Sequence, residues 1–177
     1  KENKKYDLPN KFILYQGLIH KERDLTKICH SILNLDDNIS LVCLGRDLGM
    51  LSIYKSILKE RLVHINHIDP PNHLLITKLA LAGIAVYDKK SLNTIYCAPN
   101  KLWEYTSNGV PIISSDNPSM IYDIKINGIG VIINDNDTVE GLSHKITNML
   151  NRRKDYSINC IKFYKSNINE YNNKLNE

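Results

Sequence analysis

Short apolar runs alternate with segments of helical periodicity along most of the chain. The runs at 12–15, 39–44, 62–65, 84–87, 110–114 and 130–133 are bounded by glycine or polar residues, as buried strands are. Segments with apolar residues three or four positions apart lie between and after them, at about 25–35, 51–58, 74–82, 98–108, 120–126, 138–150 and 156–175. Strands that alternate with helices need crossover connections, which make the strands parallel and place helices on both faces. The pattern therefore predicts an α/β fold: a Rossmann-like, doubly wound, mostly parallel six-stranded sheet with helices on both faces.

Chain length and composition favour one domain with its own core. The sequence has 177 residues, 42% of them hydrophobic, and 23 Lys+Arg against 19 Asp+Glu give a net charge of +4. No apolar run approaches the roughly 20 residues that a membrane helix needs. Four widely spaced cysteines without a CxxC pattern predict reduced, intracellular thiols. Residues 1–10 are charged and contain Pro9, so we interpret them as a linker from a missing N-terminal domain, with the domain itself at 11–177.

Ligands of such sheets bind beyond the carboxyl ends of the strands, so candidate chemistry is expected in the loops that follow them. In the first loop, residues 16–24, Gly17 would let the backbone approach a phosphate, and Arg23 offers a planar, bidentate clamp for an anion. This loop matches neither the dinucleotide fingerprint nor the P-loop pattern. By itself an arginine at this position is more often a surface residue, so the loop alone predicts no particular nucleotide site.

The helix predicted at 98–108 carries the densest set of polar candidates. Pro99 suits a helix start, so the backbone N–H groups near Asn100, Lys101 and Leu102 would form an anion site together with the Lys101 ammonium. A diphosphate would fit there. Glu104, one turn further, could accept hydrogen bonds from a ribose diol. The alternative is a solvated helix in which Glu104 only favours the positive N-terminal end.

Taken together, this segment resembles the donor-binding motif of GT-B glycosyltransferases, in particular the retaining glycosyltransferase family 4, or group 1. The residues that carry the resemblance are Asn100, Lys101, Leu102, Glu104, Tyr105, Gly109, Pro111, Ile113 and Ser114. Further matches are Tyr15, Gly17 and Arg23 in the first strand and loop, Gly45 after the second strand, His67 and Ile68 in the loop that holds the donor base, and Gly128 with Gly130 before the last strand. The resemblance covers most of the chain and implies the C-terminal half of a GT-B fold, that is, a nucleotide-sugar-binding domain.

The sequence departs from the family pattern in two places. Many members carry a first glutamate eight residues before the second, and Tyr96 occupies that position here. Because the first glutamate is usually assigned to the sugar, the sugar contacts would shift to neighbouring residues of 88–98. The first loop also lacks the usual pair of an arginine and a lysine five positions later, so we expect Lys101 to supply the second cation beside Arg23.

The resemblance implies transfer of a sugar from a nucleoside-diphosphate sugar, for example a UDP-sugar, to a glycan or lipid-linked acceptor in polysaccharide biosynthesis. Arg23 and Lys101 would act catalytically by stabilising the departing diphosphate, with retention of the anomeric configuration and without a metal ion or cofactor. The substrate-binding residues would be Gly17, Gly45, His67, Ile68, Tyr96, Asn100, Leu102 and Glu104. The acceptor would bind through the missing N-terminal domain, in a cytoplasmic enzyme with peripheral contact to the inner face of the cytoplasmic membrane.

Two other functions stay open at this point. One is a catalytically degenerate nucleotide-binding or interaction module, which Tyr96 favours. The other is a sugar-nucleotide epimerase of the same architecture, although the residues after the fourth strand do not supply the acidic and histidine groups that it would need. Nucleic-acid binding is not expected, because the basic residues are dispersed and lack an array of aromatic side chains for stacking.

Overall fold

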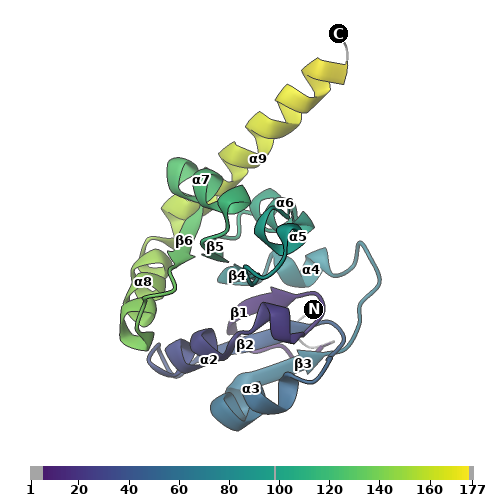
Figure 1. Cartoon of the computed structure of the whole chain (residues 1–177). Helices are drawn as coiled ribbons and strands as arrows, with labels where there is room; N and C mark the ends of the chain where they lie inside the picture. Colours follow the sequence, from purple (N-terminus) through teal and green to yellow (C-terminus); the bar gives the residue numbers. More distant parts are fainter. Residues whose placement is uncertain (1–5, 98, 176–177) are drawn as a thin grey trace.

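A computed structural model describes residues 6–97 and 99–175 as one parallel sheet surrounded by helices (Figure 1). The sheet has six strands in the order β3-β2-β1-β4-β5-β6, and every neighbouring pair is parallel. The strands are β1 (Lys11–Gln16), β2 (Ile39–Leu44), β3 (Leu62–Ile65), β4 (Ala82–Ala85), β5 (Ile112–Ser115) and β6 (Gly130–Ile133). The strand order reverses between β1 and β4, which is the switch point of a doubly wound fold. The predicted fold class is confirmed.

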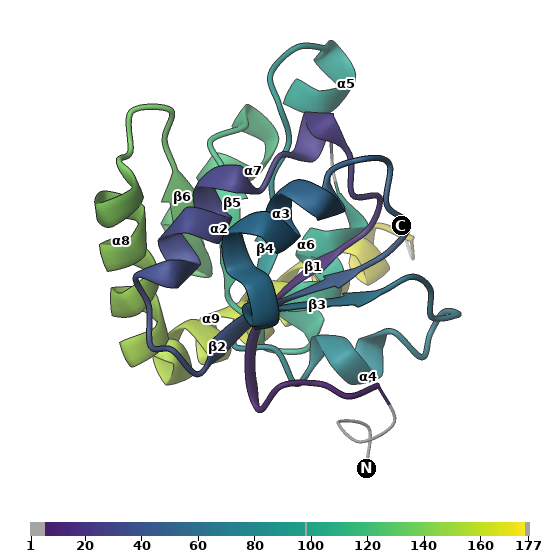
Figure 2. The same ribbon diagram turned by 90° about the horizontal axis from the view of Figure 1, so that it is seen from below.

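Successive side chains of a strand point to opposite sides of the sheet, so both faces carry apolar side chains. Helices cover both faces. In β1, Ile13 and Tyr15 belong to one buried cluster, whereas Phe12 and Leu14 belong to the other. The first cluster is completed by α2 (Thr26–Leu33), α3 (Leu51–Leu58) and α8 (Val139–Asn151). The second is completed by α4 (Leu74–Thr77), α6 (Asn100–Ser107), α7 (Pro118–Asn127) and α9 (Arg153–Leu175). Figure 2 shows α2 and α3 in front of the strands and α9 behind them.

Most predicted elements are present, with shifted ends. β4 begins two residues earlier than expected, and α4 ends at Thr77, so Ala82 lies in the strand and not in the preceding helix. The loop after β4 contains a short helix, α5 (Leu92–Ile95), that the sequence pattern did not predict. Two short 3-10 helices, η1 (Lys21–Arg23) and η2 (Lys59–Arg61), follow β1 and precede β3. The predicted helix start at residue 98 lies outside the described residues.

The segments near the two ends of the chain differ in how they pack on the domain. Residues 1–5 of the predicted linker lie outside the described residues, but Leu8 is buried in the core cluster beside Phe12 and Leu14. At the other end, the first half of α9 packs on the domain and the second half projects away from it (Figure 1). Among the described residues, no helix combines the length and the apolar character that crossing a membrane requires.

Candidate functional site

The floor of the candidate site consists of two glycines at the carboxyl ends of neighbouring strands. Gly17 follows β1 with a φ of +125°, and Gly45 follows β2 with a φ of +142°, a backbone region that other residues rarely adopt. The two backbones are so close that a Cβ on Gly45 would lie 2.1 Å from the carbonyl oxygen of Gly17. The Gly17 N–H donates to the Leu44 carbonyl at 2.8 Å. Together they leave an open backbone surface that a ligand can approach closely.

Two cationic side chains converge above this floor. A Cβ on Gly17 would lie 2.9 Å from Lys101 Nζ and 3.7 Å from an Arg23 guanidinium nitrogen. The Tyr87 ring lies beside both cations, with its centroid 5.1 Å from Arg23 Cζ and 5.3 Å from Lys101 Nζ. Lys101 Nζ also lies 3.3 Å from the Tyr87 hydroxyl. η1 supplies Arg23 and α6 supplies Lys101, so the site joins two segments that are far apart in the sequence.

Lys101 carries its charge in an unfavourable environment. Only 9% of the residue is exposed, and burial lowers the pKa of its amine to about 8, with the Arg23 charge adding to the effect. Within the part of the chain that the structure describes, the recorded ion pairs include neither Lys101 nor Arg23. Two neighbouring cations without an anionic partner favour binding of an anion, because the ligand would relieve both the repulsion and the burial of charge.

Glu104 faces the same cavity from the next turn of α6 and is already held by two donors. Gln16 Nε2 donates to one carboxylate oxygen, and His73 Nε2 lies 3.3 Å from the other. Thr77 Oγ1 donates to Gln16 Oε1 at 2.9 Å, which fixes the orientation of the amide. The Glu104 side chain remains 29% exposed. The carboxylate is therefore both oriented and accessible.

These groups line one open cavity of about 310 Å³ at the carboxyl edge of the sheet. Its base is the pair of glycines, one wall is α6, and the opposite wall is the loop after β3. The lining residues are Gln16, Gly17, Leu44, Gly45, His67, Ile68, Pro70, His73, Lys101 and Glu104. The cavity thus combines a cationic end, a carboxylate and a loop with both apolar and histidine side chains, which fits a ligand with a charged part and a flat, less polar part.

Six of the predicted site residues line this cavity: Gly17, Gly45, His67, Ile68, Lys101 and Glu104. Arg23 lies next to Lys101 at the edge of it. His67 is an exposed residue whose Nε2 pairs with Asp69 Oδ1 at 2.9 Å.

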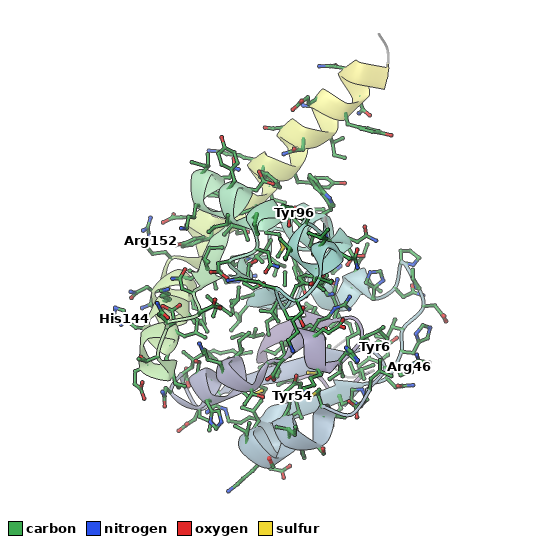
Figure 3. All side chains as sticks on the ribbon, in the orientation of Figure 1. Tyr6, Arg46, Tyr54, Tyr96, His144 and Arg152 are labelled. Carbon is green, nitrogen blue, oxygen red and sulfur yellow. The ribbon has the colours of Figure 1, made fainter. Side chains whose placement is uncertain are left out.

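The remaining three predicted residues are placed elsewhere. Leu102 packs into the hydrophobic core, and its N–H donates to the Pro99 carbonyl at 3.0 Å, so the expected donor to an anion is already used. Tyr96 is 64% exposed at the end of α5 (Figure 3). Neither Tyr96 nor the exposed Asn100 is among the residues that line the cavity. The first turn of α6 therefore offers fewer donors to a ligand than its sequence indicated.

Sequence reasoning missed Gln16 and His73. Gln16 shares the strand face of Phe12 and Leu14, which pack against the α6 side of the sheet, so the strand alternation could have placed it near Glu104. His73 has no such signal, because its position depends on the course of the loop after β3.

One acidic pattern was also overlooked in the sequence. Asp135 and Asp137 are spaced as a DxD motif in the loop after β6. Their side chains pair with Lys89 at 3.0 Å and with Lys145 at 2.6 Å, respectively. Among the described residues, no group of three His, Cys, Asp or Glu side chains is arranged to hold a metal ion.

Comparison with known proteins identifies the fold. No family model matches the sequence, and no curated protein matches it. Solved structures do match. The glycosyltransferase WaaG of lipopolysaccharide biosynthesis superposes with a TM-score of 0.72 at 11% identity over 93% of this chain and 45% of that one. Anabaena HepE in complex with UDP-glucose gives 0.73 at 7% identity over 93% and 46%.

A third structure is a domain by itself. The C-terminal domain of a group 1 family glycosyltransferase, LpcC from Francisella tularensis, gives a TM-score of 0.70 at 13% identity over 96% of this chain and 90% of that domain. The chain spans about half the length of WaaG and HepE. The chain therefore has the fold of the C-terminal domain of a GT-B glycosyltransferase.

Proposed function

We propose that this chain is the donor-binding domain of a retaining glycosyltransferase. In this proposal a nucleoside-diphosphate sugar binds in the cavity at the carboxyl edge of the sheet, and the sugar passes to a glycan or lipid-linked acceptor held by an N-terminal domain. The transfer serves polysaccharide biosynthesis on the cytoplasmic side of the membrane. The observation that carries the proposal is the pair of cations, Arg23 and Lys101, that lie beside the Gly17 backbone without an anionic partner among the described residues.

The expected chemistry follows from where charge develops. Breaking the glycosidic bond to the diphosphate leaves negative charge on the departing oxygens, while the sugar carbon becomes cationic. Arg23 and Lys101 are held in place before the ligand arrives, so they can stabilise that charge with little reorganisation. Because the two cations would balance the charge of the diphosphate, we expect the transfer to need no metal ion. Glu104 would accept hydrogen bonds from the ribose hydroxyls, and the loop carrying His67 and Ile68 would contact the base.

The UDP-sugar part of the proposal rests on a similar structure. HepE, which shares the fold, is a protein crystallised with UDP-glucose and with UDP. By the same fold we expect this chain to prefer UDP among nucleoside diphosphates.

Calorimetric titration with UDP, GDP, ADP and UDP-glucose tests this function on the 177-residue chain. We expect one diphosphate to bind, with or without Mg²⁺, and its affinity to fall about 10- to 100-fold in Lys101→Met and in Arg23→Gln, because each change removes a charged hydrogen-bond donor. Arg152→Gln is the matched control, since Arg152 lies at the exposed junction of α8 and α9 (Figure 3). The proposal would be refuted if the folded chain bound no diphosphate, or if the control variant lost as much affinity as Lys101→Met and Arg23→Gln.

A degenerate nucleotide-binding module is the second candidate, and the position of Tyr96 favours it. The family's first glutamate is replaced by this tyrosine, which is exposed and does not line the cavity. A donor domain should bind UDP-glucose with an affinity different from that for UDP, because the sugar makes contacts of its own. Identical affinities for the two ligands would support the degenerate module.

A further inference from the structure

Gln16 and His73 form hydrogen bonds to the Glu104 carboxylate, and these bonds determine how many acceptor sites the carboxylate keeps for a ligand. A carboxylate accepts hydrogen bonds and has about four lone-pair sites, two on each oxygen. Gln16 Nε2 uses one site on Oε2, and His73 Nε2 uses one on Oε1. By this count each oxygen keeps one acceptor site, and the carboxylate that carries both lines the cavity with 29% of its side chain exposed.

The two donors are themselves held by the surrounding structure. Gln16 is buried, and its amide orientation is set by the hydrogen bond from Thr77 Oγ1 to Oε1. His73 is held through its carbonyl, which accepts from the Thr77 N–H at 3.1 Å. Because an ionised carboxylate cannot donate, Nε2 must be the protonated nitrogen of His73. Thr77 on α4 therefore fixes the amide of Gln16 and the main chain at His73.

The other ring nitrogen of His73 has no such role in the folded chain. Nδ1 is buried and has no hydrogen-bond partner among the described residues. A buried nitrogen in this state costs free energy. The contact with Glu104 is therefore the one hydrogen bond that the ring makes among the described residues.

We infer that Gln16 and His73 are positioning residues that hold the Glu104 carboxylate for two adjacent hydroxyls, so that the site selects a ribonucleoside diphosphate over its 2′-deoxy form. This inference rests on the proposed function, because it concerns the ribose of the same ligand. Two neighbouring hydroxyls match two neighbouring acceptor sites, and a 2′-deoxyribose leaves one of those sites empty. A site built around hydrogen bonds to hydroxyls discriminates strongly against analogues that lack one.

The test compares UDP with 2′-deoxy-UDP by calorimetry on the 177-residue chain, or the corresponding guanosine pair if GDP is the better ligand. We expect the wild-type chain to prefer the ribose form by about tenfold or more, as for a hydrogen bond to a charged group. In His73→Leu the preference should fall to about threefold or less, mostly through weaker binding of UDP. His73→Gln, whose amide can still donate to Glu104, should restore most of the preference. His144→Leu is the matched control, because His144 is exposed on α8 away from the cavity (Figure 3).

The outcomes separate this inference from the proposed function. A folded His73→Leu chain that keeps the full preference would overturn the inference, and so would a wild-type chain that binds both forms equally. Tighter binding of UDP by His73→Leu would also overturn it, because His73 would then compete with the ligand for Glu104. In each of these cases UDP still binds and the donor-binding function stands. If no diphosphate binds at all, the proposed function fails and the inference fails with it.

Discussion

At the scale of single residues, the amine of Lys101 determines how diphosphate binding should depend on pH. Its pKa is lowered to about 8, first by burial and then by the Arg23 charge. A bound diphosphate would raise that pKa again, so binding above pH 8 must take up a proton, and the affinity must fall as pH rises. Between pH 7 and pH 9 we expect the Kd for the diphosphate to increase about tenfold, measured by calorimetry in buffers of equal ionic strength.

The Lys101→Arg variant separates this effect from other titrations. A guanidinium stays charged up to pH 9, so the affinity of that variant should change little over the same range. The neighbouring titratable groups do not change this interpretation. Burial raises the pKa of Tyr15, of Tyr87 and of the Cys97 thiol, so each of them loses its proton only at a higher pH than the same group would in water. An equal loss of affinity in wild type and Lys101→Arg would show that Lys101 is not the titrating group.

The sequence predicted the positions of some site residues and not of others. Lys101 and Glu104 were predicted together because a helix fixes their spacing, so both had to reach the same edge of the sheet. Leu102, between them, was expected to bind an anion through its N–H, and the tight first turn of α6 uses that N–H instead. His73 could not be predicted, since a loop without periodicity brings it to Glu104.

At the scale of elements, the close approach of the loops after β1 and β2 depends on Gly45. A Cβ there would lie 2.1 Å from the Gly17 carbonyl oxygen, and the backbone cannot yield without moving the floor of the site. Gly49 offers a matched comparison, because it also has a positive φ, +105°, but a Cβ there meets nothing within 4 Å. We expect Gly49→Ala to cost about 1 kcal/mol of unfolding free energy and Gly45→Ala at least about 2 kcal/mol more, measured by urea denaturation. Equal costs would show that only backbone strain matters at Gly45.

The elements that sequence predicted best are the strands. All six were found, because a parallel sheet covered by helices leaves mostly apolar runs, even in the partly buried edge strands β3 and β6. α5 was missed because four residues are too few to show a period, and its start depends on a local capping box between Ser91 and Thr94. α4 was predicted too long, because the apolar pattern continues from the helix into β4 without a break.

At the scale of the whole molecule, two core clusters on opposite faces of the sheet support the strands whose carboxyl ends carry the site. The second cluster extends into α9, where Cys160 and Phe163 are buried against α6 and its surroundings. The Trp103 ring of α6 stacks on Phe163, with centroids 5.6 Å apart and an interplanar angle of 11°. α6 also carries Lys101 and Glu104, so the packing of α9 supports the helix that forms one wall of the cavity.

This arrangement predicts that the two halves of α9 contribute very differently to stability. Phe163 is 6% exposed and stacked, whereas Tyr171, eight residues further along the same helix, is 61% exposed. We expect Phe163→Ala to lower the free energy of unfolding by about 3 kcal/mol or more, because it opens a cavity beneath Trp103. Tyr171→Ala should change it by less than about 1 kcal/mol. Trp103 is the single tryptophan of the chain, so its fluorescence during urea denaturation reports both variants directly. Similar losses in the two variants would mean that the projecting half of α9 is as much a part of the folded core as the half that packs on α6.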